Sequence, residues 1–154
     1  MTKPHLTPDP HLLSATAARA AMDAGKLDSE TLVRACLARI DARQGAVHAW
    51  EAIERLGSVN RAQALDKLSR QSPLHGMPIG VKDLIDTAAL PTTYGSAIYR
   101  GHRPKKDAAC VKTLVSAGGI VLGKTVSTEF AYFSPGPTVN PHLPGHTPGG
   151  SSSG

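Results

Sequence analysis

Residues 76–83 read GMPIGVKD, and this short stretch decides the fold class of the chain. Met77, Ile79 and Val81 alternate with small or polar residues, which is the period-two pattern of a β-strand with one apolar face. A second apolar run, Ile-Val-Leu, occupies residues 120–122, and a helical pattern separates the two runs. This strand–helix–strand order predicts an α/β sheet.

The connecting helix is expected over residues 108–117. Its apolar side chains, Val111, Leu114 and Val115, fall on one helical face, and Asp107 is placed to cap its first turn. A Gly-Gly pair follows and should end the helix. The strand on either side can then lie in one sheet.

The segment before residue 73 is predicted to be mainly helical. Helices are expected over residues 11–24, 29–43 and 59–70, with a short strand over 47–53. The predicted fold class is therefore α/β. N-terminal helices of about 1–72 cover part of a mixed sheet that begins at about residue 73, all within one domain of residues 1–154.

Charge and composition restrict the function classes. The chain has 154 residues and a formal net charge of +5, but its basic residues are scattered and the densest run, RPKK at 103–106, is short. Because no aromatic residues accompany this run, we expect no direct nucleic-acid partner. The polar, proline-rich start and the two distant cysteines predict a cytoplasmic protein without a membrane segment.

No metal or cofactor site is expected. His142 and His146 are four residues apart, but they lie among prolines rather than on a helix, so their spacing is not that of metal ligands. A Gly-Lys-Thr triplet at 123–125 resembles the end of a phosphate-binding loop. A phosphate-binding loop follows a strand and opens a helix, whereas here a helix precedes the glycines and a strand leads into the lysine, so we reject that interpretation.

Two places could supply chemistry. Lys82 lies near the end of the alternating strand at residues 77–83, beside small residues. A lysine that is buried in its neutral form can act as a general base. The alternative is an ordinary surface lysine on a half-exposed strand. Residues 149–154, GGSSSG, could aim serine hydroxyls and backbone N–H groups at one point. The alternative there is a flexible Gly/Ser linker.

Taken in order, several short motifs resemble the amidase-signature family. They are GMPIGVKD at 76–83, TYGS at 93–96, DA at 107–108 with AG at 117–118, GKT at 123–125 with EFA at 129–131, NP at 140–141 and PGGSSSG at 148–154. The resemblance covers about residues 10–154. The stretch from residue 140 to 154 is especially similar to the malonamidase type. One departure is Val126, where many members of the family carry Asn.

The resemblance implies a serine hydrolase with a triad of Lys, a serine in cis peptide linkage and a nucleophilic serine. By motif, Lys82 corresponds to the lysine and Ser151 to the cis-serine. The supporting loop would comprise Gly149, Gly150, Ser152 and Ser153. The nucleophile and the oxyanion hole belong to a later Gly-Gly-Ser element that residues 1–154 do not include, so we expect this chain alone to be inactive, as an incomplete amidase-signature domain.

The implied activity is hydrolysis of a small carboxylic amide by a soluble enzyme that uses neither metal nor cofactor, with a homodimer as an expected state of the full-length protein. Two other functions fit the sequence. One is the A-type subunit of a glutamine-dependent tRNA amidotransferase, which belongs to the same family. The other is a non-catalytic α/β module that binds a partner.

Overall fold

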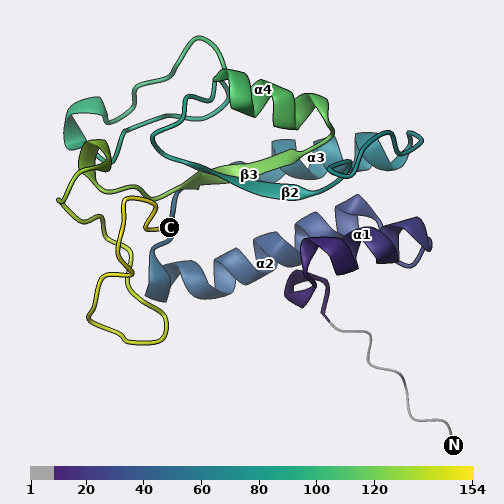
Figure 1. Cartoon of the computed structure of the whole chain (residues 1–154), viewed down its shortest axis with the longest axis horizontal. Coiled ribbons are helices and arrows are strands. Elements are labelled where there is room, and N and C mark those ends of the chain that lie inside the picture. Colours follow the sequence, from purple (N-terminus) through teal and green to yellow (C-terminus); the bar gives the residue numbers. More distant parts are fainter. Residues whose placement is uncertain (1–8) are drawn as a thin grey trace, which may run out of the picture.

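The computed structural model describes residues 9–154, so the polar stretch at the N-terminus lies outside the described residues. Four α-helices, three strands and three short 3-10 helices follow one another (Figure 1). In chain order they are η1 Pro10–Leu12, α1 Ala15–Asp23, α2 Ser29–Val47, β1 Trp50–Ile53, α3 Arg55–Asp66, β2 Pro78–Lys82, η2 Ala97–Tyr99, α4 Ala109–Ser116, β3 Ile120–Thr125 and η3 Glu129–Ala131.

The three strands form one mixed sheet in the order β1-β3-β2. Strand β3 pairs with β1 in antiparallel and with β2 in parallel orientation. The parallel pair needs a crossover connection, which α4 and the long loop before it provide. The predicted α/β class with helices covering a mixed sheet is confirmed, and β1 joins the sheet from within the N-terminal segment.

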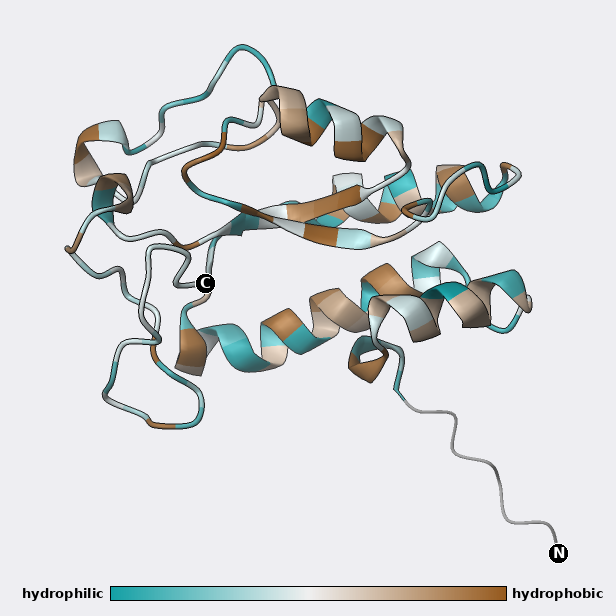
Figure 2. Ribbon diagram, in the orientation of Figure 1, coloured by the Kyte–Doolittle hydropathy of each residue, from teal (hydrophilic) through white to brown (hydrophobic). Residues whose placement is uncertain are grey.

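Helices pack on both sides of the sheet. In Figure 1, α1 and α2 lie on one side of β2 and β3, and α4 lies on the other. Figure 2 shows hydrophobic residues along the strands and on helix surfaces that face them. The polar loops gather at the end of the sheet where the C-terminus lies.

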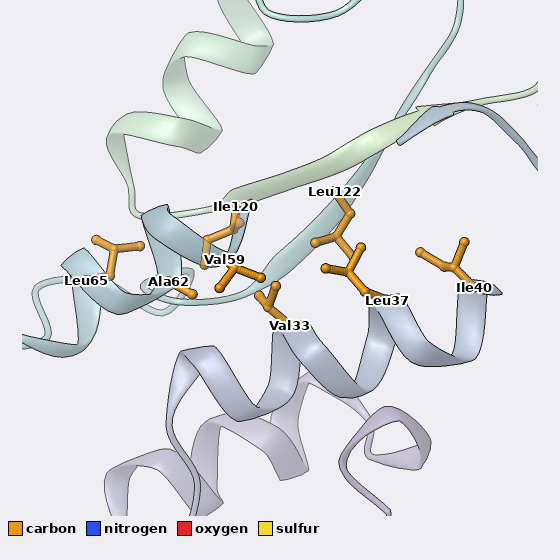
Figure 3. Close-up of a cluster of buried hydrophobic side chains, with 8 residues drawn as sticks. All are labelled: Val33, Leu37, Ile40, Val59, Ala62, Leu65, Ile120 and Leu122. Carbon is orange, nitrogen blue, oxygen red and sulfur yellow. The ribbon is translucent and has the colours of Figure 1, made fainter. Parts of the chain in front are cut away.

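The main core lies between α2, α3 and β3 (Figure 3). Its buried side chains are Val33, Leu37, Ile40, Val59, Ala62, Leu65, Ile120 and Leu122. Burying each large aliphatic side chain contributes about 1.5–3 kcal/mol. This cluster therefore fixes β3, the strand that pairs with both neighbours, against the two long helices.

Local capping explains where the helices differ from the sequence-based expectations. Helix α1 begins at Ala15 rather than residue 11, because the Ser14 hydroxyl accepts a hydrogen bond from Ala17 N at 3.1 Å. Helix α2 continues to Val47 and ends at His48, which adopts a left-handed conformation with φ of 52°. The expected strand therefore starts only at Trp50.

Two further expectations, one about the start of a helix and one about a cap, were wrong. Helix α3 begins at Arg55, four residues early, because the Glu54 side chain accepts a hydrogen bond from Gly57 N at 2.9 Å. Asp107 does not cap α4; its carboxylate instead accepts a hydrogen bond from Ala88 N at 2.7 Å and ties down the preceding loop.

Candidate active site

The two parallel strands end together at one edge of the sheet. Lys82 is the last residue of β2 and Thr125 the last residue of β3, and the two are register partners. The following amide, Asp83 N, donates to Thr125 O at 2.8 Å, so the two chains leave the sheet side by side. In α/β sheets, the loops beyond the carboxyl ends of the strands are the usual location of ligand sites.

Lys82 and Ser151 meet at this edge. The Lys82 Nζ donates a hydrogen bond to Ser151 Oγ at 2.5 Å, across a sequence separation of 69 residues. Both side chains are half-buried. Lys82 is therefore in contact with the serine hydroxyl that the family resemblance paired with it.

The Gly/Ser loop is held against the end of β3 by its backbone. Ser152 forms an isolated bridge with Ser127, and Thr128 N donates to Ser151 O at 3.0 Å. The amides of Ser153 and Gly154 both donate to Val126 O, at 3.1 and 3.0 Å. The yellow C-terminal segment in Figure 1 lies beside the end of β3 for this reason.

The remaining residues of the supporting loop occupy different environments. Gly149 has φ of +93°, and the next linkage, Gly150–Ser151, is a cis peptide bond. A Cβ at Gly150 would lie 2.6 Å from Thr128 Cγ2, so a side chain at residue 150 would require Thr128 to move. Ser152 is exposed, whereas Ser153 is buried with its hydroxyl donating to Gly149 O at 3.0 Å.

Sequence reasoning missed a second lysine. Lys124 is completely buried, and its Nζ lies 3.5 Å from an oxygen of Asp83, which is only 1% exposed. Burial lowers the pKa of Lys124, while the nearby Asp83 carboxylate opposes this shift. The sequence does contain one indication of this burial, because Lys124 closely follows the apolar run at residues 120–122. The Gly-Lys-Thr triplet suggests only a phosphate-binding loop, which hides this indication.

A cavity opens beside Ser151. Its volume is about 560 Å³, and its walls include the aromatic side chains of Tyr132 and Phe133 and the backbone of Gly149 and Gly150. The space beside Gly80, which seemed open in the sequence, is instead filled, because Trp50 and Thr125 lie within 3.2 Å of the position of a Cβ at residue 80. The open space at the site is therefore the cavity that borders Ser151.

Two kinds of feature are absent from residues 9–154. Within that range, His, Cys, Asp and Glu side chains form no group of three or more that could hold a metal ion. No helix in the described part of the chain combines the length and hydrophobicity that a membrane crossing would need.

The fold and the site define a class of α/β protein in which a strand-terminal lysine contacts a serine of a Gly-Gly-Ser loop. The Amidase family profile matches residues 31–154. The chain belongs to the amidase family.

Curated and solved relatives agree with this assignment. The A-type subunit of glutamyl-tRNA(Gln) amidotransferase from Chloroflexus aurantiacus is 40% identical over 94% of this chain and 32% of its own length. Peptide amidase from Stenotrophomonas maltophilia is 36% identical, with a TM-score of 0.87 over 95% of this chain and 34% of that enzyme. An amidase family protein from Bacillus anthracis is 29% identical, with a TM-score of 0.83 over 92% of this chain and 32% of its own. The chain thus spans about a third of the length of these relatives.

Proposed function

We propose that the chain provides the general-base half of an amide-hydrolysing active site. The observation that supports this most directly is the hydrogen bond between Lys82 and Ser151. A serine hydroxyl is a poor nucleophile until a base removes its proton. A lysine in its neutral form, in contact with an intermediate hydroxyl, can serve as that base.

The proposed reaction uses Ser151 as a relay. Ser151 takes the proton of a nucleophilic serine and passes its own proton to Lys82. The Ser151 Oγ and the Lys82 Nζ are hydrogen-bonded to each other both before and after this transfer. The nucleophile attacks the amide carbonyl, the amine leaves with a proton that returns along the relay, and water then releases the acid. No step requires a metal or a cofactor.

The nucleophilic serine and the donors that stabilise the oxyanion are proposed to lie on another segment of the protein. Residues 1–154 then supply two of the three triad members. The proposal places the scissile bond near the cavity of about 560 Å³ beside Ser151. Its mixed aromatic and backbone walls suit a small carboxylic amide.

A second candidate is ammonia release from glutamine as the A-type subunit of a tRNA amidotransferase. The observation in its favour is that the relative from Chloroflexus aurantiacus carries that name. The chemistry of amide cleavage is the same in both candidates. The second candidate also requires partner proteins, and the tRNA would then be bound by the whole complex rather than by this chain directly. Turnover of glutamine only when partner proteins are added would favour it over the small-amide enzyme.

The experiment that tests the main proposal compares two lysines. It uses the longest native form of the protein that contains residues 1–154, assayed for ammonia release from small amides. Lys82→Met keeps the aliphatic stem and deletes the base, so we expect a rate loss of about 10²–10⁴-fold or more. Lys112→Met, at an exposed position on α4, is the matched control and should retain the rate. A near-normal rate for Lys82→Met would show that Lys82 is an ordinary surface lysine.

A further inference from the structure

The carboxylate, carbonyl and amide of Asp83, the residue after Lys82, all form hydrogen bonds. Its carboxylate accepts hydrogen bonds from Thr93 N, at 3.0 and 3.2 Å to the two oxygens, and from the Thr93 hydroxyl. Its carbonyl accepts from Tyr94 N at 2.9 Å, and its amide donates to Thr125 O. Asp83 therefore joins the end of β2 to the end of β3 and to the loop that contains Thr93.

That loop continues the connection to Ser151. Tyr94 O accepts a hydrogen bond from Phe130 N at 2.8 Å. The Ser96 hydroxyl donates to Glu129 at 2.6 Å, so both bonds reach the segment just after Thr128. Since Thr128 N in turn donates to Ser151 O, the network that starts at Asp83 reaches the serine partner of Lys82.

Lys124 supplies the charge that this arrangement needs. Besides its approach to Asp83, its Nζ donates to Ile85 O and to Thr92 Oγ1, both at 2.6 Å. A carboxylate removed from water is stable only with a counter-charge and hydrogen bonds. Lys124 thus bonds two points of the segment that follows Asp83, and its own side chain has no exposure to solvent.

We propose that Lys124 and Asp83 are a positioning pair that holds Lys82 in contact with Ser151. The inference rests on the proposed function of Lys82. A pair that served stability alone could be replaced by apolar side chains with little loss. A pair that positions the base has a further effect, because a displacement of about 1 Å in a catalytic group can lower a rate about 10²-fold.

The kinetic test uses Lys124→Met, which keeps the stem of the side chain, in the longest native form that contains residues 1–154. Measured well below the unfolding temperature, kcat should fall about 10–100-fold, while KM should change little because the pair does not border the cavity beside Ser151. The control is His75→Gln, at a buried residue before the amino end of β2 whose ring bonds Leu65 O. This variant should lose stability and keep its kcat. Equal kcat losses in the two variants would overturn the proposal.

A structural readout separates this proposal from the proposed function. In a crystal structure of Lys124→Met, Lys82 Nζ and Ser151 Oγ should lie beyond hydrogen-bond distance. An intact contact would overturn the positioning role, whether or not the protein is an amidase. If Lys124→Met fails to fold, Thr92→Val removes one acceptor of Lys124 and decides the question. A several-fold drop in kcat with unchanged KM supports the pair, and an unchanged kcat rejects it.

Discussion

Gly95 lies against the backbone of Ser127, in contact so close that a Cβ at residue 95 would approach Ser127 O to 2.7 Å. Gly95 also has φ of +69°, so Gly95→Ala meets both conformational strain and a clash with backbone. We expect this variant to displace the loop that supports Ser151 and to lower both stability and amide hydrolysis. Chemical denaturation and the ammonia assay would measure the two effects.

Gly101 offers the matched control for that variant. It has φ of +81°, but nothing lies within 4 Å of where a Cβ would be. Gly101→Ala should therefore show the conformational cost alone, roughly 1–2 kcal/mol, with activity retained. Equal losses of stability and activity in the two variants would show that the contact with Ser127 is unimportant.

Residues 1–154 by themselves are expected to hydrolyse no amide, because we propose that the nucleophilic serine lies on another segment of the protein. The measurement is ammonia release from a panel of small amides at high protein concentration. Release that disappears in Lys82→Ala would contradict the prediction, and it would mean that a hydroxyl within residues 1–154 serves as the nucleophile.

Ser151→Ala removes the hydroxyl that contacts Lys82 without changing the backbone bonds of the loop. In an active form of the protein, kcat should fall about 10²–10⁴-fold while substrate binding changes little, because a relay acts only in the chemical step. Steady-state kinetics would separate kcat from KM. Ser116→Ala, at an exposed position on α4, controls for loss of a serine hydroxyl. A raised KM with unchanged kcat would assign Ser151 to binding instead.

Two leucines on neighbouring helices test the packing. Leu37 is 7% exposed in the core between α2, α3 and β3, whereas Leu56 on α3 is 72% exposed. Leu37→Ala should lower the free energy of unfolding by about 2–5 kcal/mol, and Leu56→Ala should change it by less than about 0.5 kcal/mol. Similar effects in denaturation experiments would contradict the arrangement of the helices.

Tyr94 makes the stability of the folded chain depend on pH in the alkaline range. Its hydroxyl donates to Asp86 at 2.7 Å, and this bond, with burial and the Asp86 charge, raises the pKa of Tyr94 to about 12. Because the pKa is raised in the folded state, the stabilisation is complete below the unfolded value of 10.0 and is lost as pH rises to about 12. The stability difference between wild type and Tyr94→Phe should therefore shrink between pH 10 and 12. A Tyr94 pKa near 10 by absorbance titration would refute this.

The sequence alone predicts the elements whose periodicity is strong. The alternation at 77–83 and the apolar faces of α2 and α4 identify the sheet and its covering helices, because hydrophobic burial determines these patterns. The ends of the helices are harder to predict from the sequence, because they depend on individual hydrogen bonds such as that from Gly57 N to the Glu54 side chain. Several alternative capping hydrogen bonds have similar strength, and none of them produces a periodic pattern in the sequence.

The pairing of Lys82 with Ser151 could be inferred only from the resemblance to a family. No local pattern joins residues 69 apart, because their contact depends on how β3 brings the loop after it to the end of β2. The buried Lys124 escaped notice because a lysine is almost always exposed. Its environment arises from Asp83, Ile85 and Thr92, which meet it only in the folded chain.

The long separation between Lys82 and Ser151 has a consequence for synthesis on the ribosome. At about 5–20 residues per second, the serine is made roughly 3–14 seconds after the lysine. Residues 83 to 124 are made within this interval and leave the exit tunnel ahead of Ser151, so the Asp83–Lys124 pair can form while the loop that contains Ser151 is still inside the tunnel. The nascent chain can therefore build the scaffold of its site first and bring the two reacting side chains together last.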